Sequence, residues 1–328
     1  MINESIHWAT HTMGGELIRG PGEGSFRGVS TDTRDLSPGE LFFCLVGERD
    51  GHEFAPQAAE KGAAAIVLDR DHQDLEKTLA PSVAILRVPD TLRALGDLAQ
   101  GWRRRFYIPL VGLSGSNGKT TYKELFRAIL ATRFSVLATE GNFNNLIGVP
   151  KTLFRLSPED EIAVIEMGMN DYGEIHRLTE ITEPSVGLIT NVAEAHLEKL
   201  GDVQGVAKAK GELFAGLSPE ANALVLESEP AVASIPTRAH RIPLGTRDTD
   251  LWGEVLNGSS PDPSLLKLKI HHGDRSDEVH LKLPGAHNLN NALLALAVGR
   301  FFKIPWEEAK KALEDFSGAP SRMELVHL

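Results

Sequence analysis

The feature that constrains the fold most is a glycine-rich loop that joins an apolar segment to a helical pattern. The apolar segment covers residues 108–113 and predicts a buried strand, the loop covers 114–121, and the helical pattern covers 122–131. Glycines let successive backbone N–H groups turn toward one anion, and the start of a helix adds the positive end of its dipole. This strand–loop–helix unit predicts a phosphate-binding site at the edge of a parallel sheet.

The residue types in the loop suit a nucleotide triphosphate. Lys119 is expected to reach the β- and γ-phosphates, and the hydroxyl group of Thr120 is expected to hold Mg²⁺. The strict form of this loop has a glycine at position 113, where the chain has Leu113, and the glycine stands at 112 instead. A polar turn without a ligand is the alternative, but the Gly-Lys-Thr-Thr core between a strand and a helix favours nucleotide binding. The predicted nucleotide contacts are Gly115, Ser116, Asn117, Gly118, Lys119, Thr120 and Thr121.

Strand and helix patterns alternate through most of the chain. This alternation predicts an α/β fold in which helices cover both faces of a parallel sheet. Residues 266–270 and 279–283 alternate apolar and polar side chains around a turn at 272–274, which predicts an antiparallel hairpin at an edge of the domain. The strand-like runs cover residues 41–46, 63–68, 83–88, 135–139, 162–167, 186–192 and 223–226.

Chain length and the position of a proline predict how the chain divides into domains. Its 328 residues suit about two domains of roughly 150 residues each. Pro89 closes a strand-like run and precedes a helix start. We therefore expect a small amino-terminal α/β domain at 1–88 and a P-loop-type parallel-sheet domain at 89–319. Residues 320–328 are expected to begin a linker.

Composition excludes several classes of protein. The 34 basic and 45 acidic residues leave a net charge of −11, whereas general binding to nucleic acid or to membrane surfaces needs a basic field. One cysteine, Cys44, permits neither an intrachain disulfide nor a cysteine-rich metal cluster. No apolar run approaches the roughly 20 residues that span a bilayer, and the amino terminus lacks the apolar core of a signal peptide. We expect a cytoplasmic monomer that binds no nucleic acid and inserts into no membrane.

Polar side chains follow two other strand-like runs. Glu166 closes one run, and His196 comes shortly after the next. Ligands collect at the carboxyl ends of parallel strands, and hard cations prefer carboxylate oxygens, so Glu166 is the stronger candidate for a Mg²⁺ ligand. On residue type alone, His196 is more simply a surface or capping residue. Lys208 and Lys210 alone would form a solvated helix face.

Several segments in the same order resemble the Mur ligase family, which builds the peptide of bacterial cell-wall precursors. Residues 112–121 are similar to the family's phosphate loop, including the displaced glycine. Residues 141–150, 166–170 and 195–198 resemble the branch that joins D-alanyl-D-alanine to UDP-N-acetylmuramoyl-tripeptide. The sister ligase that adds the third amino acid normally has a serine-rich stretch after the acid, where this chain has Met167-Gly168.

The two ends of the chain carry the resemblance further. Residues 30–34, with 38–39 and 50–52, are similar to the family's domain for the UDP-sugar substrate, although such a stretch alone would be a capped turn in most proteins. Residues 285–293 resemble the family's adenine-contacting helix start, where Asn288 could equally act as a helix cap. The implied substrate contacts are Ser30, Thr31, Asp32, Thr33 and Arg34, together with Asn144 and Asn145.

The resemblance implies ATP-dependent amide formation with ATP and two Mg²⁺ ions as cofactors. The tripeptide carboxylate attacks the γ-phosphate to give an acyl phosphate and ADP, and the amine of D-alanyl-D-alanine then displaces phosphate. Phosphoryl transfer needs positioning and charge neutralisation more than covalent help. The implied catalytic residues are Lys119, Lys210 and His196, and the implied metal ligands are Thr120, Glu166 and His196.

Three further roles rest on the resemblance alone. Lys210 matches a lysine that family members carry as a carbamate, an anion that can orient Mg²⁺ as a free lysine does not. Asn291 is expected to contact adenine. Arg322 is expected to sit at a hinge near the nucleotide.

The end of the chain leaves alternatives open. Family members continue past residues 321–324 into a third, Rossmann-like domain that closes over the nucleotide. We expect that domain to be absent here, so that the chain binds both substrates but ligates poorly, because closure assembles the site. A nucleotide-binding fragment without ligation, the sister ligase that adds the third amino acid, and a regulatory P-loop protein remain alternatives.

Overall fold

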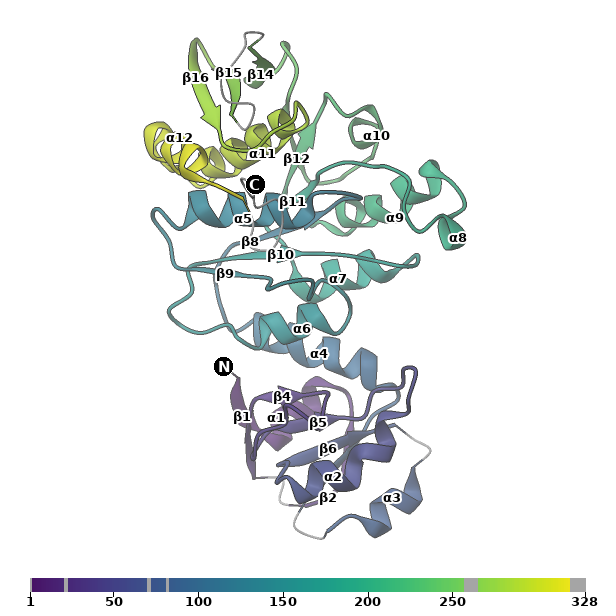
Figure 1. Ribbon diagram of the computed structural model, residues 1–328. Helices are drawn as coiled ribbons and strands as arrows, with labels where there is room; N and C mark the ends of the chain where they lie inside the picture. Colours follow the sequence, from purple (N-terminus) through teal and green to yellow (C-terminus); the bar gives the residue numbers. More distant parts are fainter. Residues whose placement is uncertain (1, 21–22, 70–71, 81–82, 257–264, 319–328) are drawn as a thin grey trace, which may run out of the picture. The chain divides into compact units, whose positions relative to one another are not determined.

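The structure consists of two compact units (Figure 1). The first contains Met1–Tyr107 and Leu146–Pro158, and the second contains Ile108–Asn145 and Glu159–Leu328. This computed structural model describes residues 2–20, 23–69, 72–80, 83–256 and 265–318. The expected linker at 320–328, and Arg322 with it, lie outside the described residues.

The first unit ends later in the chain than the predicted boundary at residue 88. Helix α4 (Thr91–Arg103) packs against α1 (Ile6–Thr12) and α6 (Gly148–Leu153), so it belongs to the first unit. The sequence identifies the apolar face of α4 but not the core which that face joins. Helix α6 also belongs to the first unit, although the residues that precede it, Ile108–Asn145, belong to the second unit. No local sequence pattern predicts this crossing between units.

A five-stranded sheet forms the centre of the first unit. Its strands have the order β2-β7-β6-β5-β4, with β4 to β7 parallel and β2 antiparallel to β7. A short pair, β1 (Asn3–Ser5) and β3 (Ser25–Arg27), lies beside it. The remaining strands are β2 (Glu16–Arg19), β4 (Val29–Ser30), β5 (Leu41–Phe43), β6 (Ala65–Leu68) and β7 (Ala84–Arg87). The remaining helices are a 3₁₀ turn (Gly51–Phe54), α2 (Ala55–Glu60) and α3 (Gln73–Thr78).

A six-stranded, wholly parallel sheet forms the centre of the second unit. Its order is β13-β12-β11-β8-β10-β9, so β8 (Leu110–Ser114) is an interior strand flanked by β11 and β10. The parallel strands with helices between them confirm the predicted α/β class. The other strands are β9 (Val136–Ala138), β10 (Ile162–Glu166), β11 (Val186–Ile189), β12 (Asn222–Leu226) and β13 (His240–Leu244).

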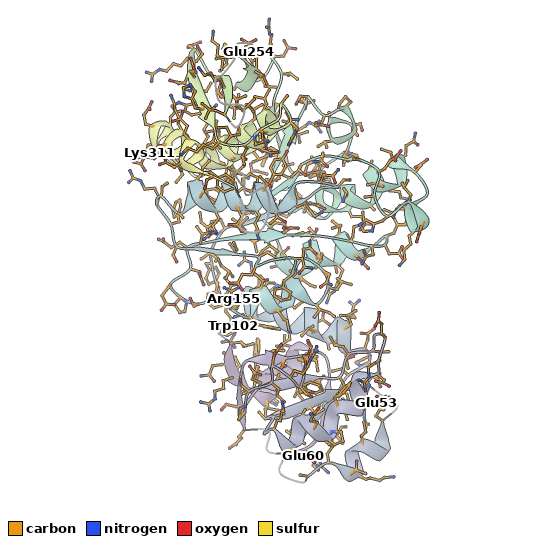
Figure 2. The ribbon with its side chains drawn as sticks, viewed as in Figure 1. Glu53, Glu60, Trp102, Arg155, Glu254 and Lys311 are labelled. Carbon is orange, nitrogen blue, oxygen red and sulfur yellow. The ribbon has the colours of Figure 1, made fainter. Side chains whose placement is uncertain are left out.

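Helices cover both faces of this sheet. Helix α5 (Lys119–Leu130) packs on one face, while α7 (Glu174–Thr182) and α9 (Val203–Gly216) pack on the other (Figure 1). Ten buried residues on α11 (Asn288–Phe301) make it a helix surrounded by apolar neighbours, between α5 and the antiparallel strands. Side chains fill the space between sheets and helices in each unit (Figure 2). The short helices are α8 (Leu197–Leu200) and α10 (Pro230–Ala233), and α12 (Trp306–Asp315) follows α11.

The predicted hairpin forms, but it does not extend the parallel sheet. Strands β15 (Leu266–His272) and β16 (Arg275–Leu281) pair around the expected turn, and β14 (Leu251–Val255) joins β15 to make a separate antiparallel sheet. Apolar residues of this sheet, including Leu268 and Val279, pack in the same core as α11. The alternation in the sequence shows that one face is buried, but it does not show against which element.

None of the helices in the described part of the chain has the length and apolar character needed to cross a membrane.

Candidate nucleotide and substrate sites

The phosphate loop leads from β8 into α5 and is held by the segment after β11. Gly118 precedes the helix with a φ of 75°, in the left-handed region that favours glycine, and no side chain caps the helix start. The Asn191 side chain accepts a hydrogen bond from the Asn117 N–H and donates one to the Asn117 carbonyl, each at 2.9 Å. A Cβ atom on Gly115 would lie 1.8 Å from Oγ1 of Thr190, so this glycine permits the close approach of the two segments. The loop is therefore a formed anion cradle at a helix start.

Two lysines converge on one carbonyl oxygen of this loop. Nζ of Lys119 and Nζ of Lys210 donate to the Gly115 carbonyl at 2.8 and 2.9 Å. Lys210 projects from α9 and is 3% exposed. Burial, with a smaller contribution from the charge of Lys119, lowers the pKa of Lys210 to about 7. A substantial fraction of Lys210 is thus an uncharged amine near neutral pH.

A buried carboxylate faces the start of the same helix. Glu166, at the end of β10, is 2% exposed, and its Oε2 accepts a hydrogen bond from the Thr120 hydroxyl at 3.4 Å. Asn144 Nδ2 donates to Oε1 of Glu166 at 2.8 Å, and the Glu166 N–H donates to the Thr139 hydroxyl at 3.0 Å. A carboxylate and a hydroxyl oxygen beside a phosphate cradle are the hard donors that Mg²⁺ prefers. The donor set fits the predicted Mg²⁺ site.

Lys123 adds a buried charge behind this carboxylate. Its side chain is 1% exposed, and Nζ donates to the Thr139 carbonyl at 2.5 Å and lies 3.2 Å from a Glu124 carboxylate oxygen. Thr139 in turn accepts from the Glu166 backbone through its hydroxyl group. The hydrogen bonds that Lys123 and Glu166 donate to Thr139 therefore fix the end of β10, where Glu166 lies.

His196 is not brought to this cluster by any contact among the described residues. It precedes α8 with a φ of 53° and is exposed, and neither a hydrogen bond nor an ion pair joins it to Glu166. In the described part of the chain, one group of three acidic or histidine side chains lies close enough to share an ion, and it consists of Asp50, His52 and His72 in the first unit. A second metal ligand at His196 thus remains a prediction.

A pocket of about 460 Å³ opens beside the phosphate loop. The start of α11 forms one wall, and the first turn of α5 forms another. Asn291 lines the pocket on the side of α11, and its Nδ2 donates to Asn288 Oδ1 at 2.5 Å; its contact with adenine stays a prediction. The lining residues are Asn117, Gly118, Thr121, Tyr122, Thr190, Asn191, Glu229, His287, Asn288, Asn290 and Asn291. The volume and position suit the nucleoside of a nucleotide whose phosphates occupy the loop.

Sequence reasoning missed several of these lining residues. Glu229 lies at the start of α10, and the Asn290 amide donates to it at 2.8 Å. Burial raises the pKa of Glu229 above its usual value. No local motif marks Glu229. Its side chain lines the pocket and accepts a hydrogen bond from Asn290, a residue of α11 that is far away in the sequence. A search for acids after strand-like runs would have included it, since it follows β12 closely.

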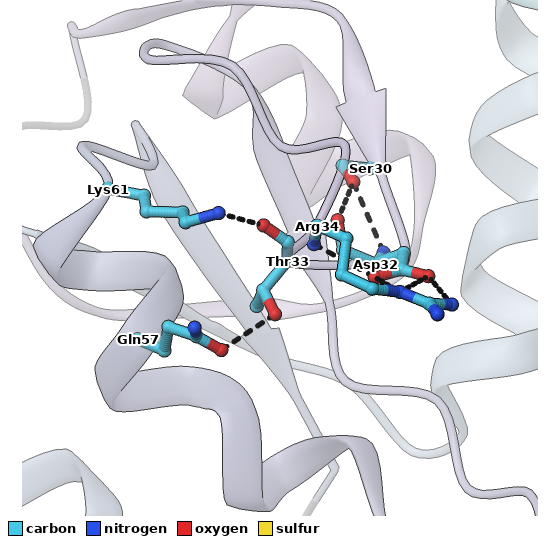
Figure 3. A network of polar contacts seen from close by, with 6 residues as sticks. All are labelled: Ser30, Asp32, Thr33, Arg34, Gln57 and Lys61. Atoms are coloured by element: carbon cyan, nitrogen blue, oxygen red, sulfur yellow. Dashed lines mark hydrogen bonds and ion pairs between the residues drawn. The ribbon is translucent and has the colours of Figure 1, made fainter.

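The first unit holds a compact polar turn after β4 (Figure 3). The Ser30 hydroxyl donates to the Asp32 carbonyl at 2.9 Å, and Asp32 accepts from the backbone N–H and the guanidinium of Arg34. These bonds hold the pKa of Asp32 down to about 2. The Thr33 hydroxyl donates to Gln57 at 2.7 Å, and Lys61 Nζ donates to the Thr33 carbonyl at 2.5 Å. Thr31 lies half-buried within this turn.

The two asparagines predicted as substrate contacts differ in their surroundings. Asn144 points its amide at Glu166, and its backbone carbonyl accepts from the Gly168 N–H at 2.7 Å. A Cβ atom on Gly168 would lie 2.8 Å from the Asn144 side chain. Asn145 is exposed. The geometry thus gives Asn144 a role in positioning Glu166, which the sequence did not suggest.

Two family models match most of this chain. Residues 113–299 match the Mur ligase middle domain, and residues 25–103 match the catalytic domain of the Mur ligase family. The chain belongs to the Mur ligase family. Among curated Mur ligases, the UDP-N-acetylmuramoyl-tripeptide–D-alanyl-D-alanine ligase of Synechocystis is 41% identical over 87% of this chain and 60% of its own length. The ligase of that name from Escherichia coli is 37% identical over 100% of this chain and 71% of its own length.

A solved structure agrees with these matches. MurF from Acinetobacter baumannii superposes with a TM-score of 0.89 and 30% identity, over 100% of this chain and 71% of that one. This Mur ligase chain therefore spans between 60% and 71% of the length of the relatives described.

Proposed function

We propose that this protein is an ATP-dependent ligase that joins D-alanyl-D-alanine to UDP-N-acetylmuramoyl-tripeptide in the synthesis of peptidoglycan precursors. The curated relatives with 37% and 41% identity bear the name of that ligase. The observation that carries the proposal is the cluster at the phosphate loop, where Lys119 and Lys210 meet at Gly115 and Thr120 meets Glu166. A MurF ligase of Thermotoga maritima, 26% identical with a TM-score of 0.79, has a structure described as a complex with ADP, which supports ATP as the nucleotide.

The first chemical step is transfer of the γ-phosphoryl group. A carboxylate oxygen of the tripeptide forms a bond to the γ-phosphorus, and the bond to the β,γ-bridging oxygen breaks, which gives an acyl phosphate and ADP. Lys119 would hold the β- and γ-phosphates, while loop N–H groups orient them. Thr120 and Glu166 would hold Mg²⁺, which when bound neutralises charge that develops on the transferring group.

The second step forms the amide. The neutral amine of D-alanyl-D-alanine attacks the acyl carbon, inorganic phosphate leaves with the electron pair of the broken bond, and the amine nitrogen loses a proton. The acyl phosphate makes this attack favourable because phosphate is a far better leaving group than the original carboxylate oxygen. We assign recognition of the UDP-substrate to the turn at Ser30–Arg34 and to Asn145, and contact with adenine to Asn291.

Lys210 is proposed to act as a carbamate. Its lowered pKa of about 7 supports this, because only the uncharged amine attacks carbon dioxide, with loss of a proton, to form the carbamate. The product would place an anion beside the phosphate loop, where it could orient a second Mg²⁺ together with His196. Native mass spectrometry in the presence and absence of bicarbonate tests this, and a mass that does not respond to bicarbonate would contradict it.

Calorimetric titration tests the proposed substrate. We expect UDP-N-acetylmuramoyl-tripeptide to bind in the presence of a non-hydrolysable ATP analogue, and UDP-glucose to bind much more weakly. Binding of the analogue without selective binding of the tripeptide would contradict the proposed substrate and favour a nucleotide-binding protein of another kind. Location in the cytoplasm and the monomeric state stay predictions.

A further inference from the structure

Glu229 is the one carboxylate among the described residues that line the nucleoside pocket. It stands at the position that caps α10, where an acid usually accepts a hydrogen bond from its own helix, but its side chain makes no such bond. Its Oε1 instead accepts a hydrogen bond from Nδ2 of Asn290, on α11, at 2.8 Å. The carboxylate is therefore directed toward the pocket wall formed by α11 rather than toward α10.

The partners of Asn290 fix the orientation of this pair. The Ser228 hydroxyl donates to Asn290 Oδ1 at 3.4 Å, so the oxygen of the amide faces Ser228 and the nitrogen faces Glu229. One N–H of that nitrogen is used by Glu229, and the second is available to a ligand. Among the described residues, Oε2 of Glu229 has no hydrogen-bond partner. Glu229 and Asn290 thus present an acceptor beside a donor.

The edge of adenine complements this arrangement. Its exocyclic amine is a donor, and the adjacent ring nitrogen is an acceptor. Guanine and hypoxanthine carry an oxygen in place of that amine, which would bring two acceptors together at Glu229.

We propose that Glu229, oriented by Asn290, selects adenine over other purines by accepting a hydrogen bond from its exocyclic amine. This inference rests on the proposed function, because it takes the nucleotide to be bound with its phosphates in the loop. A hydrogen bond to a charged acceptor contributes more than one between neutral groups, so loss of this bond should lower affinity about 10-fold.

The test compares nucleotide dissociation constants for the whole chain and two matched variants. The ligands are ATP, ITP and purine riboside triphosphate, which lacks the exocyclic amine, each with Mg²⁺ and without the other substrates. The variants are Glu229→Gln and, as a control two residues away, Glu227→Gln. Glu227 pairs with Arg241 at 3.0 Å and does not line the pocket.

The ratio of affinities separates recognition from a general charge effect. The unaltered chain should bind ATP about 10-fold more tightly than ITP and than purine riboside triphosphate. Glu229→Gln should bring ATP and ITP within about 3-fold of each other, because a glutamine amide can rotate to donate to the oxygen of hypoxanthine. Glu227→Gln should leave the ratio unchanged.

Three results would overturn the inference. If the unaltered chain binds ATP and purine riboside triphosphate equally well, the exocyclic amine is not recognised and the inference is wrong. An unchanged ATP-to-ITP ratio in Glu229→Gln, or an equal loss of both, would show that the carboxylate holds the ribose or the fold instead. If the unaltered chain binds none of the three triphosphates, the proposed function fails, and the inference fails with it.

Discussion

Lys119 and Lys210 donate hydrogen bonds to the same carbonyl oxygen, that of Gly115, although they lie on different helices. Burial, with a smaller contribution from repulsion by the Lys119 ammonium group at the same oxygen, lowers the pKa of Lys210 to about 7. An anion in the loop, or a carbamate on Lys210, would relieve the repulsion. The phosphate loop therefore holds an arrangement that favours added negative charge.

The lowered pKa of Lys210 makes stability depend on pH. Below about pH 7 the lysine is protonated in both the folded and the unfolded chain, so the cost of burying its charge is fully present. Between a folded pKa of about 7 and the ordinary value of 10.5, the unfolded chain binds more protons, so the free energy of unfolding rises with pH. The rise is at most about 4–5 kcal/mol, at about 1.36 kcal/mol per pKa unit.

Urea unfolding in buffers free of carbon dioxide measures this dependence. The unaltered chain should gain stability relative to Lys210→Met as the pH is raised from about 6 to about 9, because the variant lacks the titrating group. Lys208→Met is the control, since Lys208 is exposed on the same helix. Parallel pH curves for the unaltered chain and Lys210→Met would show that Lys210 does not titrate as the structure indicates.

Asn144 should control Mg²⁺ affinity through Glu166. Its amide donates to Oε1 at 2.8 Å and so fixes the carboxylate that would bind the metal. Loss of such an outer partner typically costs about 10–100-fold in metal affinity. Asn144→Ala should raise the Mg²⁺ concentration needed for half-maximal ATP binding by about 10-fold, whereas Asn142→Ala, in the same loop but exposed, should not change it. An effect on ATP affinity alone, at saturating Mg²⁺, would argue against this role.

Gly115→Ala should be destabilising because of one neighbour. The added Cβ would lie 1.8 Å from Oγ1 and 3.1 Å from Cβ of Thr190. Overpacking of this kind costs about 1–3 kcal/mol in the free energy of unfolding. Thr190→Ala removes the atom in closest contact, so the double variant should recover part of the loss, measured as a favourable coupling in a double-mutant cycle. Strictly additive effects would mean that the close approach of these segments does not constrain the loop.

Asp32→Asn should weaken binding of the UDP-substrate and leave ATP binding unchanged. Asp32 accepts from the backbone and the guanidinium of Arg34, and the resulting charge-assisted bonds shape the turn after β4. Loss of the charge should release Arg34 and lower affinity for UDP-N-acetylmuramoyl-tripeptide about 10-fold. Asp35→Asn, at an exposed position in the same segment, is the matched control. If both variants bind the tripeptide as the unaltered chain does, the turn is not the substrate site.

Local patterns in the sequence were sufficient for the elements around the phosphate loop. The predicted strand at 162–167 and helix at 122–131 correspond to β10 and α5, because continuous apolar runs and a period of about 3.6 reflect burial directly. The assignment of α4 to the second domain failed, because its amphipathic pattern does not reveal which core receives it. The antiparallel hairpin formed as predicted, but its alternating pattern did not reveal that its buried face packs with α11.

The site likewise contains residues that local sequence patterns predict and residues that only the tertiary fold brings together. Glu166 was predicted because it ends a strand beside the loop, and the structure brings it to Thr120. Lys210 alone read as a solvated residue, yet it is buried against Gly115, which only tertiary packing determines. Glu229 follows β12 closely enough for the same search to include it, but its contact with Asn290, 61 residues away in the sequence, depends on the tertiary fold.

The fate of a carboxylate oxygen tests the proposed ligation most directly. The chain would be incubated with ATP, Mg²⁺, D-alanyl-D-alanine and UDP-N-acetylmuramoyl-tripeptide labelled with ¹⁸O in the reacting carboxylate. Attack of that carboxylate on ATP predicts one labelled oxygen in each phosphate released, in step with formation of the new amide and of ADP. Release of unlabelled phosphate, or consumption of ATP that does not depend on the tripeptide, would contradict the account.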